Sequence, residues 1–297
     1  MLPKLTNKKT VAAIGKFDSF HVGHAGLIRT ACKIAKEKDI LSLILFIGSH
    51  SPEIISEEES GRIVSSFGID LALRQELDEE FRSLSAESFV KDILSDRLNC
   101  ECVIVGDNFR FSKNRSADAN ELKRLCNENS IECIIIEEIR LRNSLSEVCT
   151  VSSTYIRELI SKGMMEDVSR FLGRPYEISA SVTNGRHIGS SLGIPTANLI
   201  PPKGKLLPPD GVYATCTTVD EERYLSITNI GSNPTVSDKS DKTIETNILN
   251  FDLDIYGESI KVEFFEMIRG EIRFDSLDKL KKQINKDVNY VKEKYYV

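Results

Sequence analysis

The chain has 297 residues, a length that favours two domains at roughly 100–200 residues per domain. Hydrophobic residues make up 40% of the chain and charged residues 28%, which excludes a disordered chain and a fibrous repeat. Acidic residues outnumber basic residues by 45 to 39, and no basic run is long enough to attract a nucleic acid, so we expect no nucleic-acid partner.

The chain has no apolar run long enough for a membrane span or a secretory signal. A span needs about 18 consecutive apolar residues, so we expect no membrane partner. The apolar stretch after the charged N-terminus is shorter than a signal-peptide core, which favours a cytoplasmic protein. Seven scattered cysteines then indicate reduced, mostly buried thiols. Cys100 and Cys102 belong to one apolar strand-like run, which explains their spacing better than a metal site does.

The first half of the chain alternates strand-like and helical patterns. Residues 11–15 form a strand-like run, apolar residues recur at helical spacing over 27–35, and residues 41–46 form a second apolar run. The order repeats with a helix face over 89–98 and a strand-like run over 102–106. Continuous apolar strands that alternate with helices are typical of a parallel sheet covered on both sides. We therefore predict an α/β domain with a doubly wound parallel sheet.

The second half of the chain has a different pattern. Apolar segments of strand length are separated by Gly, Pro, Asn and Asp, with little helical periodicity between them. These segments cover residues 212–219, 224–230, 244–251 and 260–268. They predict an antiparallel barrel, and an apolar stripe from Leu277 to Val291 predicts a helix that packs across it. We expect the domains to cover residues 1–174 and 175–297.

The segment GKFDSFHVGH joins the first strand to the first helix, where open α/β sheets bind their ligands. Gly15 permits a tight turn and Gly23 permits close approach of a phosphate, while His21 and His24 offer N–H groups near the helix start. No nucleophile is placed for covalent chemistry, so direct attack of one phosphate on another, a nucleotidyl transfer, fits this segment. The alternatives are a chance surface pair of histidines or part of a zinc site.

A second segment, VSSTYIRELI, precedes the end of the first half. Ser152, Ser153 and Thr154 offer hydroxyl groups before a helix, and Arg157 lies one turn into that helix with a guanidinium that can bind a phosphate. Ordinary helix capping is the alternative, because Ser and Thr are preferred N-cap residues.

The second half contains a glycine-rich loop followed by oxygen-bearing side chains. Gly185, Gly189 and Gly193 give the backbone freedom to wrap a phosphate chain, although no Walker A motif occurs in the chain. Thr196 and Asn198 are two residues apart on an extended segment, so their side chains share one face. A hydroxyl and a carboxamide oxygen there suit Mg²⁺ that carries nucleotide phosphates. Polar decoration of an edge strand is the alternative reading.

Glu245 lies on a predicted strand, in TIETNILNF. Its carboxylate is a candidate general base toward an alcohol that attacks the γ-phosphate of a nucleotide. A single acidic residue on a strand is more often a solvated surface charge, so the cluster of motifs carries more weight than Glu245 alone.

GKFDSFHVGH and VSSTYIR together resemble the signature pair of the HxGH nucleotidylyltransferase superfamily. VGDNFRFSKNRSAD, LFIGSHSPEII and LGRPYEI narrow the resemblance to the adenylyltransferase half of the prokaryotic bifunctional riboflavin kinase/FAD synthetase family. The resemblance assigns an ATP site to Gly15, Phe17, Asp18, His21, Gly23, His24, Ser152, Ser153, Thr154 and Arg157. It assigns the FMN side to His50, Pro52, Asn108, Phe109 and Arg110. The two histidines are the expected catalytic residues of this half.

PTAN, NIGSNPTV, IETNILNFDLDIYG and MIRGEIRF resemble the six-stranded riboflavin kinase barrel of the same family in their order and approximate spacing. The resemblance implies that Thr196 and Asn198 hold Mg²⁺ with ADP or ATP, and that Glu245 is the catalytic base on the riboflavin 5′-hydroxyl. Arg269 and Glu271 would belong to the flavin-side lid. The expected small molecules are riboflavin, FMN, FAD, ATP, ADP and pyrophosphate, and we expect a monomer or a weak homo-oligomer.

The chain departs from the usual residues of that family at several positions. These are Ser19, Ser112 and Ala117 in the first half and Ser190, Asn247 and Asn250 in the second. The second group keeps an alternative open, in which only the adenylyltransferase is active and the barrel is a flavin-binding regulatory module. A non-catalytic flavin sensor is a further alternative, and an adenylyl- or cytidylyltransferase acting on another phosphate ester ranks last because it leaves the barrel unexplained.

Overall fold

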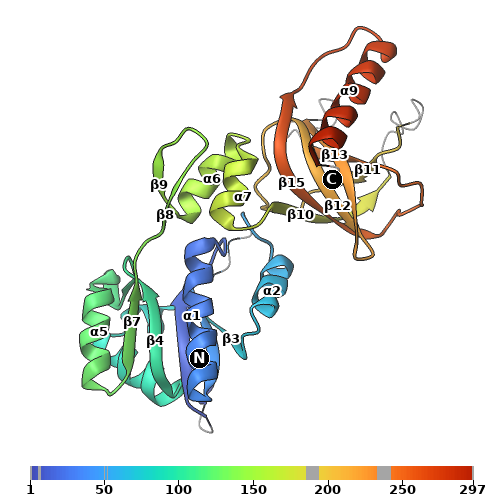
Figure 1. Cartoon of the computed structure of the whole chain (residues 1–297). Helices are drawn as coiled ribbons and strands as arrows, with labels where there is room; N and C mark the ends of the chain where they lie inside the picture. Colours follow the sequence, from blue (N-terminus) through green and yellow to red (C-terminus); the bar gives the residue numbers. More distant parts are fainter. Residues whose placement is uncertain are drawn as a thin grey trace. The chain divides into compact units, whose positions relative to one another are not determined.

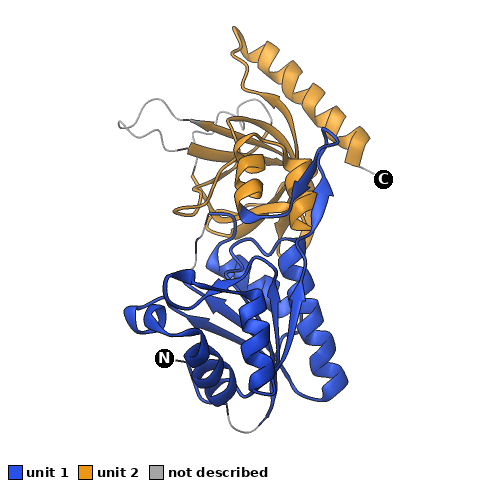
Figure 2. Cartoon of the chain, turned by 90° about the vertical axis from the view of Figure 1, so that its left-hand side faces the viewer, with its two compact units in different colours: residues 1–153 blue, residues 154–297 orange. Residues whose placement is uncertain are grey.

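The computed structural model describes residues 2–5, 8–49, 51, 53–184, 194–232 and 242–295. The chain forms two compact units, residues 1–153 and 154–297, which Figure 2 shows in two colours. The domain limits expected from the sequence, 1–174 and 175–297, stay predictions. No helix in the described part of the chain is long and apolar enough to cross a membrane.

The first unit is built on a five-stranded parallel sheet in the order β3-β2-β1-β4-β7 (Figure 1). The strands are β1 (Thr10–Gly15), β2 (Leu41–Ile47), β3 (Leu71–Gln75), β4 (Cys100–Gly106) and β7 (Glu132–Ile136). Each pair in the sheet is parallel. The predicted parallel sheet is therefore confirmed, and the strand order reverses between the neighbours β1 and β4.

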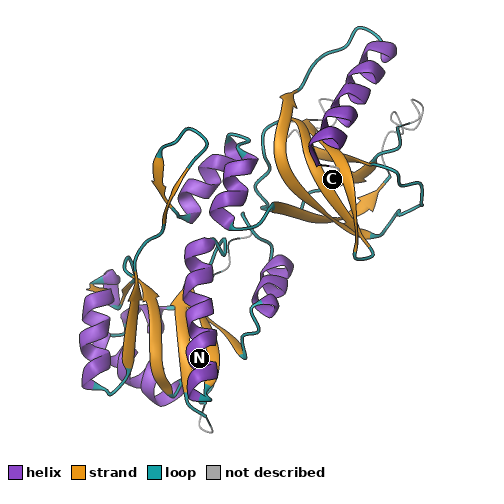
Figure 3. Ribbon diagram, viewed as in Figure 1, coloured by secondary structure: helices purple, strands orange, loops and turns teal. Residues whose placement is uncertain are grey.

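Helices flank this sheet, as Figure 3 shows. They are α1 (Val22–Lys38), α2 (Glu57–Ser66), α3 (Glu79–Ser83), α4 (Ala86–Ser88), η1 (Phe89–Arg97) and α5 (Ala119–Glu128), with a short 3₁₀ turn η2 (Lys113–Arg115). Two small hairpins pair β5 (Arg110–Phe111) with β6 (Ala117–Asp118) and β8 (Arg140–Arg142) with β9 (Val148–Thr150). The helix face expected over 89–98 is wound as a π-helix, and the Leu98 amide donates to the Ile93 carbonyl five residues earlier.

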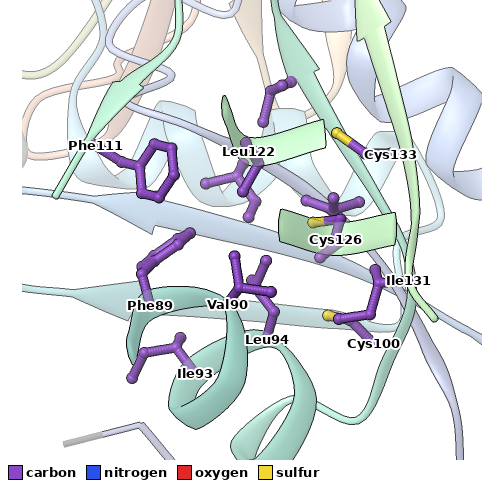
Figure 4. Packing of buried hydrophobic residues seen from close by; sticks show 14 of the residues in the cluster. Phe89, Val90, Ile93, Leu94, Cys100, Phe111, Leu122, Cys126, Ile131 and Cys133 are labelled. Atoms are coloured by element: carbon purple, nitrogen blue, oxygen red, sulfur yellow. The ribbon is translucent and has the colours of Figure 1, made fainter. Parts of the chain in front are cut away.

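The core of the first unit lies between the sheet and the helices η1 and α5. Figure 4 shows Phe89 and Leu94 of η1 together with Leu122 and Cys126 of α5 in one buried cluster. All seven cysteines are free thiols and five of them are buried. Burial raises the pKa of the Cys100 thiol to about 12, because a thiolate loses its hydration in an apolar core. The predicted reduced, mostly buried thiols are confirmed.

The second unit contains a closed barrel in the order β10-β11-β14-β13-β12-β15, with all described pairs antiparallel. The strands are β10 (Tyr176–Thr183), β11 (Ala197–Leu199), β12 (Gly211–Val219), β13 (Glu222–Ser232), β14 (Lys242–Ile248) and β15 (Ser259–Gly270). Helices α6 (Ser153–Ser161) and α7 (Met165–Leu172) precede the barrel, and α9 (Leu277–Tyr295) follows it. The predicted six-stranded barrel and its C-terminal helix are confirmed.

Alternation along the barrel strands separates an inner face from an outer face. Inside, a chain of fully buried hydroxyl groups links β12, β13 and β14, from Thr215 through Thr228 to Thr246, with Oγ1–Oγ1 distances of 2.8 and 2.9 Å. Outside, Val291 of α9 packs against Val212 and other apolar side chains of β12 and β13. The sheet is thus apolar where the helix covers it, and the rest of the outer face is available for polar chemistry.

Candidate functional site

A cavity of about 760 Å³ lies at the carboxyl ends of four parallel strands in the first unit. Gly15, Ile47, Gly106 and Ile136 are the last residues of β1, β2, β4 and β7, and all four line the cavity. Because β1 and β4 are neighbours at the point where the strand order reverses, this is the position at which doubly wound sheets bind ligands. The volume lies within the range of about 300–1,000 Å³ that holds a small molecule.

His21 and His24 line this cavity at the start of α1. His21 is the N-cap residue, and its Nδ1 accepts a hydrogen bond of 3.2 Å from the backbone N–H of His24. The two imidazole rings are stacked, with centroids 3.7 Å apart and an angle of 10° between the planes. The sequence pattern therefore brings both histidines to one wall of the cavity, beside the positive end of the helix dipole.

Two glycines leave room for this arrangement. A Cβ atom on Gly23 would lie 3.1 Å from Nδ1 and Cε1 of His21, so any side chain there would crowd the imidazole. A Cβ atom on Gly15 would lie 3.2 Å from the Phe17 ring. The structure thus gives a steric reason for a glycine at both positions, while their predicted place in an ATP site stays a prediction.

The loop between β1 and α1 is held by aromatic packing despite an unusual backbone. Phe17 and Phe20 have positive φ values, 51° and 46°, and both side chains are buried. Their rings stack at a centroid distance of 5.8 Å, and both pack against Phe46 of β2. Asp18 is also buried and forms an ion pair of 2.8 Å with Lys16. Strained residues of this kind persist only where surrounding contacts fix them, and they gather at functional sites.

Ser19 connects the two motif segments of the first unit. Its hydroxyl lies 2.8 Å from the hydroxyl of Ser153, and its side chain is fully buried. Ser152 and Ser153 line the cavity, and their binding of ATP stays a prediction. Thr154 and Arg157 belong to the second unit, and their part in an ATP site stays a prediction.

The expected FMN side is only partly described. Asn108 and Phe109 line the cavity, and the amide of Asn108 donates a 2.9 Å hydrogen bond to the carboxylate of Glu138. Arg110 lines it too and lies 3.5 Å from the Asp118 carboxylate. The two remaining residues assigned to this side, His50 and Pro52, lie outside the described residues.

The structure adds lining residues that the sequence analysis missed. Phe81, Arg82 and Leu84 come from α3 and its end, and Asn114 and Arg115 come from the η2 turn. Two arginines, Arg82 and Arg115, thus line the cavity from segments that are distant in sequence from the histidine motif. The segment around α3 carried no motif, so the sequence offered no signal for its role.

The barrel has a second candidate site on the outer face of β11, β14 and β13. Glu245 is in register with Asn198 on one side and with Asn229 on the other. Directly paired residues in an antiparallel sheet point to the same face, so the three polar side chains form one row. Glu245 is half-buried within that row. Asn229 was not predicted as a site residue, although it is the first residue of the quoted NIGSNPTV motif.

The candidate metal ligands come just before and within β11. The side-chain amide nitrogen of Asn198 donates a 3.4 Å hydrogen bond to the Thr196 carbonyl oxygen. The side-chain oxygen of Asn198 is therefore the atom that could bind a cation. Asn247 donates a 2.7 Å hydrogen bond to the Pro195 carbonyl and thereby ties β14 to this segment. Gly185, Gly189, Ser190 and Gly193 of the glycine-rich loop lie outside the described residues. The described oxygen donors fit a hard cation such as Mg²⁺.

Arg269 and Glu271 stand at the end of β15 and just beyond it. The guanidinium of Arg269 contacts the carboxylate of Asp287 on α9, with an Nη2–Oδ2 distance of 2.8 Å. A Cβ atom on Gly231 of β13 would lie 2.7 Å from Oε1 of Glu271, so the carboxylate of Glu271 rests directly on that glycine. Glu271 is therefore close to Asn229, two residues before Gly231 on the same strand.

Two sites thus occur in one chain. One is a strand-end cavity with paired histidines and hydroxyl groups, and the other is a barrel face with a carboxylate between amide side chains. Neither arrangement contains a nucleophile aligned for a covalent intermediate among the described residues. Together the fold and the sites define an enzyme class that transfers nucleotidyl and phosphoryl groups between bound substrates.

Comparisons with known proteins give this class its family. The model of the FAD synthetase family matches residues 4–154, and the model of the riboflavin kinase family matches residues 172–295. A bifunctional riboflavin kinase/FMN adenylyltransferase of Buchnera aphidicola subsp. Schizaphis graminum is 34% identical over 305 residues, which cover 99% of this chain and 96% of the relative. One of Bacillus subtilis is 29% identical over 299 residues, which cover 96% and 92%. The chain belongs to the bifunctional riboflavin kinase/FMN adenylyltransferase family.

A solved structure supports the fold over the whole chain. It is titled a macrolide-efflux protein from Streptococcus pneumoniae, has a TM-score of 0.85 and 26% sequence identity, and covers 97% of this chain and 95% of its own. The family models and the relatives described above, rather than the name of that structure, carry the functional assignment. Riboflavin, FMN and FAD are the substrates and products of the family, and both of its catalytic domains are present.

Proposed function

We propose that the chain makes FAD from riboflavin in two ATP-dependent steps at two separate sites. The barrel transfers the γ-phosphoryl group of ATP to riboflavin, and the first unit transfers the adenylyl group of a second ATP to FMN. The observation that carries the proposal is the stacked pair His21 and His24 in a cavity at the ends of four parallel strands. The row Asn198, Glu245 and Asn229 supports the kinase step in the same way.

In the adenylyltransferase, an oxygen of the FMN phosphate attacks the α-phosphorus of ATP. A new P–O bond forms, the bond between the α-phosphorus and the bridging oxygen breaks, and pyrophosphate leaves with that oxygen. His21 and His24 offset the negative charge that builds up during this exchange. Arg157 and the hydroxyl groups of Ser152, Ser153 and Thr154 complete the proposed ATP site.

The rest of the proposed adenylyltransferase site serves to shape and orient the substrates. Gly15, Phe17, Asp18 and Gly23 build the loop under the ATP phosphates. The FMN side comprises His50, Pro52, Asn108, Phe109 and Arg110. Alignment of the two phosphates is the main catalytic effect here, because neither substrate is activated covalently.

In the kinase, Glu245 accepts the proton of the riboflavin 5′-hydroxyl while the hydroxyl oxygen forms a bond to the γ-phosphorus of ATP and ADP leaves. Thr196 and Asn198 would hold Mg²⁺, which neutralises phosphate charge when bound. Gly185, Gly189 and Gly193 are proposed to wrap the phosphate chain. Arg269 and Glu271 are proposed to lie on the flavin side.

We propose a cytoplasmic enzyme that acts as a monomer or weak homo-oligomer, without a nucleic-acid partner. The free, mostly buried thiols support a reducing compartment. The acidic excess of the chain supports the absence of a nucleic-acid partner.

A time course with the purified chain tests the proposal. Reactions with MgATP are started separately from riboflavin and from FMN, and the three flavins are separated by chromatography and measured by fluorescence. We expect FMN and then FAD from riboflavin, and FAD from FMN. Conversion of FMN alone would show that the barrel is a binding module, and no conversion in either reaction would favour a flavin sensor. A reaction without Mg²⁺ tests the metal requirement.

A further inference from the structure

Asp287 is a buried acidic residue where the C-terminal helix packs on the barrel. It lies on α9, and only 3% of its surface is exposed. Its Oδ2 accepts hydrogen bonds from Nε and Nη2 of Arg269, at 3.0 and 2.8 Å. Its Oδ1 accepts a 2.7 Å hydrogen bond from the side-chain amide of Gln283, one helical turn earlier. Both carboxylate oxygens are therefore used, and the carboxylate is fixed from two sides.

Arg269 is fixed in turn. Besides its two bonds to Asp287, its Nη1 donates a 3.1 Å hydrogen bond to the Gly270 carbonyl. Its side chain is only 16% exposed. The guanidinium is thus used to join the end of β15 to α9, and this sets the position of the chain that leaves the barrel.

That chain is a short strap, residues 271–276, between the end of β15 and the start of α9. The Arg269–Asp287 ion pair closes the loop by linking the strand before the strap to the helix after it. Glu271 is the first residue of the strap, and its carboxylate rests on Gly231 of β13. Asn229 lies on the same strand and is in register with Glu245. A shift of α9 would therefore move Glu271 relative to the row that contains the proposed base.

We propose that Asp287 is a positioning residue of the riboflavin site. Through Arg269 it holds the strap so that Glu271 stays against β13, beside the row of Asn198, Glu245 and Asn229. The C-terminal helix then has a role in binding the flavin substrate in addition to covering the barrel. This inference rests on the proposed kinase function of the barrel and on the flavin-side assignment of Glu271.

Asp287→Asn tests the inference with little change in size. A carboxylate accepts from Arg269 and Gln283 at once, whereas an amide has a single acceptor oxygen, so one contact becomes a clash of two donors. We expect the KM for riboflavin to rise about tenfold because a displaced binding group weakens substrate alignment. The KM for ATP and the rate of FMN adenylylation should stay within about twofold of the unmodified chain.

The matched control is Asp278→Asn, the same change at an exposed position of the same helix. It should leave the KM for riboflavin unchanged. Gln283→Ala is a milder second variant that keeps the Arg269–Asp287 pair, and we expect a rise of about twofold to threefold in the same constant. It keeps the inference testable if Asp287→Asn fails to fold.

Two results would overturn the inference. One is an unchanged KM for riboflavin in folded Asp287→Asn, or in Gln283→Ala if the first variant does not fold. The other is an equal rise in the KM for riboflavin and the KM for ATP, which would mean general damage to the barrel. If the unmodified chain does not phosphorylate riboflavin, the proposed kinase function itself fails, and this outcome is distinct from the other two.

Discussion

At the scale of single residues, Ser112 has a backbone conformation that normally belongs to glycine. Its φ and ψ are 69° and 176°, a region that is costly for any residue with a Cβ atom. Its hydroxyl donates a 3.1 Å hydrogen bond to the Leu84 carbonyl, and the Lys113 amide donates to the same carbonyl at 3.0 Å. These bonds join two walls of the proposed adenylyltransferase cavity, so the serine combines local strain with a stabilising contact.

Substitutions at Ser112 separate these two effects. Ser112→Ala keeps the strain and loses the hydrogen bond, so it should lower the free energy of unfolding by about 1 kcal/mol. Ser112→Gly loses the same bond but releases the strain, so it should be more stable than the alanine variant by about 1 kcal/mol after the entropy cost of glycine. Urea unfolding of the three proteins checks this order. An alanine variant more stable than the glycine variant would contradict the strained backbone.

At the scale of elements, Asn247 fastens β14 to the segment before β11. Its 2.7 Å hydrogen bond ends on the Pro195 carbonyl, directly before the proposed metal ligand Thr196. Asn247→Ala should lower kcat/KM for riboflavin phosphorylation about tenfold and raise the Mg²⁺ concentration needed for half-maximal rate, because Thr196 is less well aligned. Kinase assays over a range of Mg²⁺ concentrations check this. FMN adenylylation by the same protein is the control, and an unchanged Mg²⁺ dependence would contradict the role of Asn247.

Asp70 links β2 to the turn before β3 and makes that link sensitive to acid. The Ser42 hydroxyl and the Ser42 amide donate to its carboxylate, at 2.6 and 2.8 Å, and these bonds lower the pKa of Asp70. Because the pKa is lower in the folded state, this stabilisation is present above about pH 4 and is lost as the pH falls through the folded-state pKa.

Asp70→Asn should therefore lower the free energy of unfolding by about 1 kcal/mol near neutral pH. This is less than the loss of a buried hydrogen bond to a charged group would cost, because Asp70 is exposed. The difference from the unmodified protein should stay constant above about pH 4 and shrink as the pH falls below that value. Urea unfolding at several pH values measures it. A difference that does not shrink in acid would exclude the carboxylate as its source.

At the scale of the whole molecule, the two proposed sites share no residue. His24→Ala should reduce FAD formation from FMN by at least about a hundredfold and leave riboflavin phosphorylation intact, because it removes a charge-stabilising group from one cavity only. Glu245→Ala should do the reverse, because it removes the proposed base of the kinase. Flavin chromatography of both reactions checks each variant, with circular dichroism as the control for folding. A folded variant that loses both activities would contradict two separate sites.

The fold was largely predictable from local patterns. Strands buried on both faces appear as apolar runs such as residues 102–106, and the helices between them have apolar residues at helical spacing. The barrel was predictable because its strands are separated by turn-forming residues. The π-winding of η1 was not, because the apolar pattern gives no signal for a backbone bond from Leu98 to Ile93, five residues earlier.

The sequence by itself determined the parallel sheet, the barrel and the motif residues, because burial periodicity and glycine positions are local properties of the chain. The tertiary structure decided what surrounds those motifs. Phe81 and Arg82 reach the cavity only because α3 packs near the η2 turn, and Arg269 meets Asp287 only because α9 lies across the barrel. Such contacts join residues that are distant in the chain, and their side-chain geometry follows from how whole elements pack, which no local pattern encodes.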